Sequence, residues 1–185
     1  MNTQELREGI LHECLIKEDT LFASGEPADN KLDIERLDSN SDFTSEVVRR
    51  LGRKVLEEAP DFVVGVPNGA NWLAKEVKEL TPKLNLVVLN KDLDGNISFA
   101  DKRSGYIALH GFRGVIVEDV FNRFTSTRKV LDLEPLGSKI VSAVSVWDRG
   151  NPADRTELEI PHTSLVTEYI PEQLGSHSEL WKYTT

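Results

Sequence analysis

Two adjacent carboxylates, Glu118 and Asp119, stand between the apolar run 114–117 and a loop rich in hydroxyl and amide side chains. A helical pattern over 126–133 follows this loop. Carboxylates accept hydrogen bonds from the vicinal hydroxyls of a ribose, whereas hydroxyls, loop amides and a helix N-terminus bind phosphate. We therefore expect Glu118 and Asp119 to act as catalytic residues on a ribose. The residues expected to hold its 5-phosphate are Asn122, Arg123, Thr125, Ser126 and Thr127.

A second segment has the composition of a phosphate-binding loop. The apolar run 61–66 ends at Pro67, Asn68 and Gly69, and a helical pattern resumes at Trp72. Small residues between a strand and a helix expose backbone amides, and such amides bind phosphate groups. The residues of this loop are Gly65, Val66, Pro67, Asn68, Gly69 and Ala70.

Two further segments add polar candidates. The stretch 22–33, which carries Ser24 and Gly25, has the composition of a turn and predicts a loop or a short hairpin. A buried strand predicted over 84–89 leads into the charged segment 90–103, whose lack of apolar periodicity predicts a mobile or hairpin loop. The first cation of this segment is Lys91.

Each of these features also has a plainer interpretation. The pair Glu118 and Asp119 could be solvated acids at a strand end, and the segment 65–70 could be an ordinary turn, since proline, asparagine and glycine are typical turn residues. Lys91 could simply keep a surface soluble. The strand before the acid pair and the helix after it favour the ribose site.

The segments between Phe22 and Val146 resemble, in order and spacing, the type I phosphoribosyltransferases, and the Ser24-Gly25 stretch is similar to that of the orotate phosphoribosyltransferases. The resemblance implies phosphoribosyl pyrophosphate (PRPP) as donor, a pyrimidine-type base such as orotate as acceptor, and Mg²⁺ bound mainly through PRPP. It also implies the type I fold, a homodimer, binding of the diphosphate by the loop 65–70, and a catalytic role for Lys91. In that dimer Lys91 could be supplied by the neighbouring subunit to neutralise the leaving diphosphate.

Several positions depart from the family pattern. Asn122, Arg123 and Phe124 stand where the family has two small hydroxyl residues and a glycine, and Ala23 stands where the orotate branch has a lysine. A glycine at position 124 would allow a positive φ or a close approach to phosphate, and a phenylalanine suits neither. Asp94 places a negative charge in a loop where the family has cations. These departures favour an alternative, a catalytically impaired relative that binds a nucleotide or a protein partner.

The elements that must position these residues alternate between short β-branched runs and helical patterns. Amphipathic helices are predicted over 3–16 and 42–58, and further buried strands over 114–117 and 139–147. The alternation predicts an α/β fold with a central, mostly parallel sheet flanked by helices, whose ligand crevice lies at the carboxyl ends of the strands. We expect a single domain, 1–185, with an N-terminal helix and hood loop (1–40), an α/β core (41–150), and a C-terminal tail (151–185) that adds an edge strand over 164–169.

Composition restricts the function further. The 185 residues, 39% of them apolar, suffice for one core. A net charge of -9 and a pI near 5.0 argue against binding of nucleic acid. The scattered histidines predict no metal site built by the protein itself. The lone Cys14 and the absence of a membrane helix or signal-peptide pattern predict a cytoplasmic protein.

Overall fold

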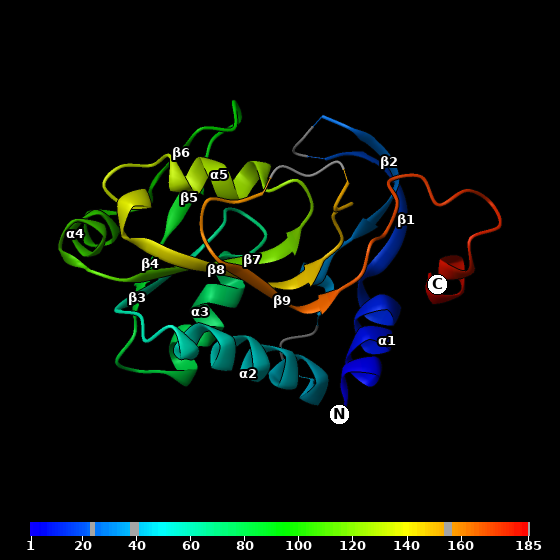
Figure 1. Ribbon diagram of the computed structural model, residues 1–185, viewed down its shortest axis with the longest axis horizontal. Helices are drawn as coiled ribbons and strands as arrows, with labels where there is room; N and C mark the ends of the chain where they lie inside the picture. Colours follow the sequence, from blue (N-terminus) through cyan, green and yellow to red (C-terminus); the bar gives the residue numbers. More distant parts are fainter. Residues whose placement is uncertain (23–24, 38–40, 154–156, 185) are drawn as a thin grey trace.

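The computed structural model describes residues 1–22, 25–37, 41–153 and 157–184. A five-stranded sheet in the order β4-β3-β7-β8-β9 runs through the centre of the molecule, and every pairing in it is parallel (Figure 1). The predicted α/β class and parallel sheet are therefore confirmed. The strands are β3 (Phe62–Gly65), β4 (Asn85–Val87), β7 (Gly114–Phe121), β8 (Ile140–Asp148) and β9 (His162–Thr167).

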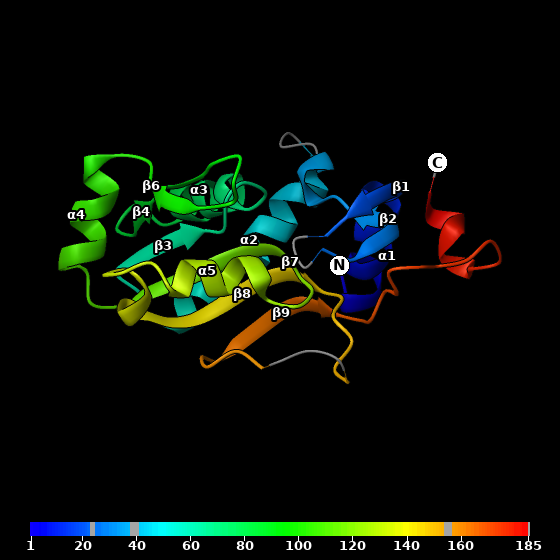
Figure 2. The ribbon, with the colours of Figure 1, turned by 90° about the horizontal axis from the view of Figure 1, so that it is seen from above.

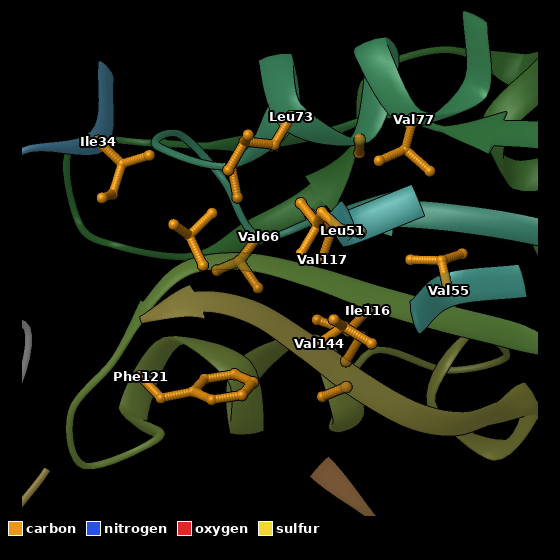
Figure 3. Close-up of a cluster of buried hydrophobic side chains, with 14 of the residues drawn as sticks. Ile34, Leu51, Val55, Val66, Leu73, Val77, Ile116, Val117, Phe121 and Val144 are labelled. Carbon is orange, nitrogen blue, oxygen red and sulfur yellow. The ribbon is translucent and has the colours of Figure 1, made fainter. Parts of the chain in front are cut away.

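Helices cover both faces of the sheet. α2 (Asp42–Glu57) and α3 (Asn71–Leu80) lie on one face, α5 (Thr125–Leu131) lies on the other, and α4 (Lys102–His110) lies beside the β4 edge (Figures 1 and 2). Because both faces are covered, β3 and the first half of β7 consist of buried residues. Each fully buried aliphatic side chain contributes about 1.5–3 kcal/mol. Figure 3 shows the resulting cluster, which includes Leu51, Val55, Leu73, Val77 and Val117.

The two ends of the chain form a small hood at one end of the molecule (Figures 1 and 2). α1 (Thr3–Cys14) leads into a hairpin of β1 (Leu15–Leu21) and β2 (Pro27–Leu32), and the C-terminal segment ends in the 3-10 helix η3 (Glu179–Tyr183). Asp29 on β2 accepts hydrogen bonds from the backbone amides of Leu174 (3.0 Å) and Gly175 (3.4 Å). Arg7 on α1 pairs with Glu168, which follows β9. The hood is thus tied together and attached to the sheet.

The segment 84–110 differs most from the sequence prediction. The predicted strand is interrupted at Val88, whose amide donates to Ser104 Oγ (3.0 Å), so the chain divides into β4 and β5 (Leu89–Lys91). β5 pairs with β6 (Ile97–Phe99) in a hairpin, as one of the two predicted loop forms. The helix α4 that follows was not predicted. Its apolar residues do not form one buried stripe, because Tyr106 and Leu109 are exposed.

The sheet also extends beyond the predicted core. Its fifth strand, β9, comes from the segment assigned to the tail and corresponds to the edge strand predicted over 164–169. β7 continues to Phe121, so the acid pair belongs to the strand itself. Two short 3-10 helices, η1 (Ile34–Arg36) and η2 (Gly137–Lys139), complete the fold. None of the helices in the described residues combines the length and the apolar character needed to cross a membrane.

Candidate functional site

A cleft of about 380 Å³ opens at the carboxyl ends of β3 and β7. Most of its lining comes from three parts of the chain that are distant in sequence: the loop 66–69 after β3, the segment 118–127 at the end of β7, and the hood residues 20–22 and 31–33. Glu35, Lys91 and Arg149 also line it. β3 and β7 are neighbours in the sheet. The loops predicted to bind diphosphate and 5-phosphate therefore face one cleft, at the edge where parallel sheets bind ligands.

Glu118 is a buried acid at the base of this cleft. Only 6% of the residue is exposed, and its carboxyl accepts a hydrogen bond from Thr127 Oγ1 (3.1 Å). Burial, and secondly the charge of Asp119, raise the pKa of Glu118 well above its usual value. A group held in this way can bind a hydroxyl as an acceptor or, with its proton retained, as a donor.

Asp119 lies directly against the loop after β3. Its Oδ1 accepts a hydrogen bond from the backbone amide of Val120 (2.7 Å). A Cβ placed on Gly69 would lie 2.4 Å from its Oδ2. No side chain larger than hydrogen fits at position 69 unless Asp119 moves. Gly69 therefore allows the acid and the loop to border the same small volume.

The loop after β3 divides into a lining part and a supporting part. Val66, Pro67, Asn68 and Gly69 line the cleft. Gly65 and Ala70 are buried at its two ends, where a Cβ on Gly65 would lie 2.5 Å from the Ala70 carbonyl oxygen. Both residues were predicted to bind diphosphate, but in the structure they shape the turn while the four residues between them face the cleft.

Phe124 adopts the conformation that the sequence prediction reserved for glycine. Its φ of 59° and ψ of 15° are left-handed, and it is the N-cap of α5. Its ring packs against Phe121 (5.0 Å between centroids) and His162 (4.8 Å). The residue borders the cleft but is only 2% exposed. The ring is therefore held in the core and does not fill the cleft, and the expectation that a phenylalanine does not suit a positive φ at this position is wrong.

Neither a protein-family model nor a curated protein matches the sequence. Solved structures do match: the orotate phosphoribosyltransferase of Aeropyrum pernix superposes with a TM-score of 0.63 at 20% identity, over 90% of this chain and 93% of that chain. The fold is that of the orotate phosphoribosyltransferases.

Two further structures share this orotate phosphoribosyltransferase fold. The Mycobacterium tuberculosis orotate phosphoribosyltransferase, solved in complex with PRPP, has a TM-score of 0.61 at 18% identity, covering 89% of this chain and 95% of that chain. Leishmania donovani UMP synthase has a TM-score of 0.67 at 19% identity, covering 90% of this chain but 36% of that chain. The chain thus corresponds to one part of the longer protein.

On this fold, Arg123 links the cleft to the hood. The sequence predicted that its guanidinium binds phosphate, and in the structure it pairs with Glu26 in the turn between β1 and β2. Asn122, Thr125, Ser126 and Thr127 line the cleft with it. Gly25 lies in the same turn, with a φ of 85°, and is not among the described residues that line the cleft. Ser24 lies outside the described residues.

Lys91 lines the cleft of its own chain. It is the last residue of β5 and is half-buried. Asp94, the negative charge that raised doubt about this loop, is exposed at the hairpin tip and is not among the described residues lining the cleft.

Arg149 is a functional candidate that sequence reasoning missed. It follows β8, lines the cleft and is 2% exposed. Its Nη2 donates to Asn30 Oδ1 (2.8 Å) and to the Ile170 carbonyl (3.0 Å), and its guanidinium lies over the ring of Phe22 at 4.9 Å. Burial lowers the pKa of Arg149 to about 10. Its position could have pointed to this role. Arg149 is the first cation after the strand predicted over 139–147, and the carboxyl end of that strand lies beside the acid pair.

Proposed function

We propose that this protein transfers the ribose 5-phosphate of PRPP to a pyrimidine-type base such as orotate and releases diphosphate. The observation that carries the proposal is the contact of Asp119 with Gly69, which joins an acid pair to an amide-lined turn in one cleft. The orotate phosphoribosyltransferase fold supports it. The proposal includes a cytoplasmic homodimer, as the sequence resemblance implies.

Each wall of the cleft suits one part of PRPP. Glu118 and Asp119 would accept the ribose hydroxyls, the loop 65–70 would hold the diphosphate, and the loop 122–127 would hold the 5-phosphate. Lys91 would neutralise the departing diphosphate. Fixed charges that meet a charge developing in the transition state usually supply the largest part of catalysis.

The hood side of the cleft suits the base. Arg149 presents a guanidinium that is already held in place by Asn30 and the Ile170 carbonyl. A guanidinium forms strong, directional hydrogen bonds with a carboxylate such as that of orotate. The ring of Phe22 offers an apolar surface for a flat base.

The acid pair also fits the magnesium ion that the resemblance implies. Magnesium is commonly held by one or two carboxylates together with phosphates of the substrate. Asp119 would supply one such carboxylate and PRPP most of the other oxygens, and among the described residues no cluster of three or more His, Cys, Asp or Glu side chains forms a separate site. When bound through PRPP, the ion would neutralise negative charge on the diphosphate.

A specific observation favours a second candidate function. Arg123, the cation of the 5-phosphate loop, is already paired with Glu26. A catalytically impaired relative that binds a nucleotide or a protein partner would tolerate this pairing. The pairing would withdraw the charge of Arg123 from the substrate, and removing one charged transition-state contact commonly lowers the rate by about 100- to 1000-fold.

Calorimetry with PRPP and Mg²⁺, combined with a diphosphate-release assay over several bases, tests the proposal. Binding with turnover on a pyrimidine-type base supports the transferase. Binding without turnover on any base favours the impaired relative. An Asp119→Asn variant is the control, since it should lose PRPP binding and yet retain the fold. If the unchanged protein neither binds PRPP nor turns it over, the transferase proposal is wrong.

A further inference from the structure

The hairpin that carries Lys91 is fixed at its base to its own chain. Asn71, the first residue of α3, donates from Nδ2 to the carbonyl of Leu89 on β5 (3.0 Å). The amide of Ala100 donates to the Val88 carbonyl (3.0 Å) just before β5. Leu89 itself is completely buried. The first strand of the hairpin is therefore held by both a side chain and the core.

The tip of the hairpin is also held. The amide of Asn96 donates to Asp92 Oδ1 (2.8 Å), and the amide of Gly95 donates to the Asp92 carbonyl (3.1 Å), which closes the turn. Lys129 on α5 donates from Nζ to the Gly95 carbonyl (2.9 Å). The tip of the hairpin is therefore held to a helix of its own chain.

We propose that the Lys91 hairpin completes the cleft of its own chain, and that Asn71 is the positioning residue that holds it there. Asn71 follows the loop 65–70 directly, so one helix start fixes both the loop expected to hold the diphosphate and the strand that carries Lys91. The inference rests on the proposed function, because it takes the diphosphate as the partner of Lys91.

A first experiment measures the positioning without any ligand. Asn71→Ala removes the donor to Leu89, and amide hydrogen exchange over 89–99 should become at least several-fold faster, because local opening follows lost hydrogen bonds. Asn85→Ala is the matched control. Asn85 also donates from Nδ2 to a backbone carbonyl, that of Asp61 (3.2 Å), but it lies at the amino ends of the strands and not at the carboxyl ends where the cleft opens. Unchanged exchange over 89–99 in Asn71→Ala overturns the positioning role.

A second experiment asks whether Asn71 acts through Lys91. Asn71→Ala should lower kcat about tenfold, with little change in the KM for PRPP, because a small displacement of a group that acts on the leaving diphosphate mainly affects the transition state. In a Lys91→Ala background the same substitution should add no further loss. Losses that multiply in the double variant would overturn the inference, because Asn71 would then act by another route.

Mixing two inactive variants tests which chain supplies the lysine. Lys91→Ala and Asp119→Asn leave different parts of the cleft intact, and a lysine supplied by the partner would restore about a quarter of the activity in randomly mixed dimers. We expect no restoration, and restored activity would refute the inference. If the unchanged protein shows neither PRPP binding nor turnover, the proposed function fails, while hydrogen exchange still decides whether Asn71 holds the hairpin.

Discussion

The ring of Phe124 lies 4.8 Å from the ring of His162, and this contact joins the loop after β7 to the first residue of β9. The contact explains how a bulky residue occupies a left-handed position. The left-handed backbone costs about 1–2 kcal/mol, whereas complete burial of a phenylalanine contributes about 1.5–3 kcal/mol. Packing therefore outweighs the backbone cost, and the loop keeps a conformation that glycine would adopt freely.

Replacing Phe124 by glycine or by alanine should reveal the two contributions separately. Phe124→Ala loses the ring and keeps the backbone cost, so we expect a loss of about 3–5 kcal/mol in the free energy of unfolding. Phe124→Gly loses the same ring without the backbone cost and should be about 1 kcal/mol more stable than the alanine variant. Urea unfolding measures both.

The reference for this comparison is Gly105, inside α4, where an added Cβ would meet Phe99 at an ordinary 3.9 Å. Alanine should be the more stable residue there, as is usual in helices. If alanine were also the more stable at position 124, the left-handed conformation of that residue would be refuted.

Gly69→Ala should weaken PRPP binding while the protein stays folded. The new Cβ would lie 2.4 Å from Asp119 Oδ2, so the carboxylate must move away from the place where it would meet the ribose. We expect the dissociation constant for PRPP, measured by calorimetry, to rise at least about tenfold, since each lost charged hydrogen bond is worth about 1.5–3 kcal/mol.

Gly52→Ala provides the control for Gly69→Ala, because its Cβ would meet Leu80 at 3.6 Å, an ordinary contact on α2. Its PRPP affinity should equal that of the unchanged protein. Equal affinities in both alanine variants would show that the contact between Asp119 and Gly69 is unimportant for binding.

The sequence predicted the parts of this site that local spacing determines. A buried run followed by an acid pair and a polar loop predicts a strand whose carboxyl end binds a ligand. This holds even though Glu118 and Asp119 lie within the strand and not after it. The conformation of Phe124 could not be predicted from the sequence because it depends on a contact with His162. That residue lies near the loop only because of the order of the strands in the sheet. The role of Arg149 likewise depends on Asn30 and Ile170, which belong to the two ends of the chain.

Arg149→Lys should separate binding of the base from binding of PRPP. A lysine cannot reproduce the planar set of donors that reaches both Asn30 and the Ile170 carbonyl, so the unfolding free energy should fall by about 1–3 kcal/mol. The KM for the base should rise far more than the KM for PRPP, because Arg149 lies on the hood side of the cleft. Steady-state kinetics with each substrate varied in turn measures this difference.

The control for this substitution is Arg113→Lys. Arg113 also donates to a backbone carbonyl, that of Glu58 (3.1 Å). It is exposed, however, and lies just before β7, at the amino ends of the strands and away from the cleft. Its replacement should leave both KM values unchanged. Equal rises of the two KM values in Arg149→Lys would assign Arg149 a purely structural role.

Glu118 should make the protein less stable as the pH rises from acid to neutral. Its ordinary pKa is 4.5, and burial together with Asp119 raises the pKa in the folded chain. Between these two values the folded state retains a proton that the unfolded state has lost, so the free energy of unfolding falls with rising pH. The loss begins as the pH passes 4.5 and is complete above the raised pKa.

Glu118→Gln removes this titration and keeps an oxygen that can accept the hydroxyl of Thr127. The variant should therefore unfold at a higher urea concentration than the unchanged protein at neutral pH. The difference should shrink toward about pH 4, because the carboxyl of Glu118 is then mostly protonated in both the folded and the unfolded state. The same substitution at the exposed Glu57 shows how much the overall charge contributes. An advantage of Glu118→Gln that grew toward acid pH would mean that the folded state stabilises the ionised carboxylate, and the buried, proton-retaining acid would be refuted.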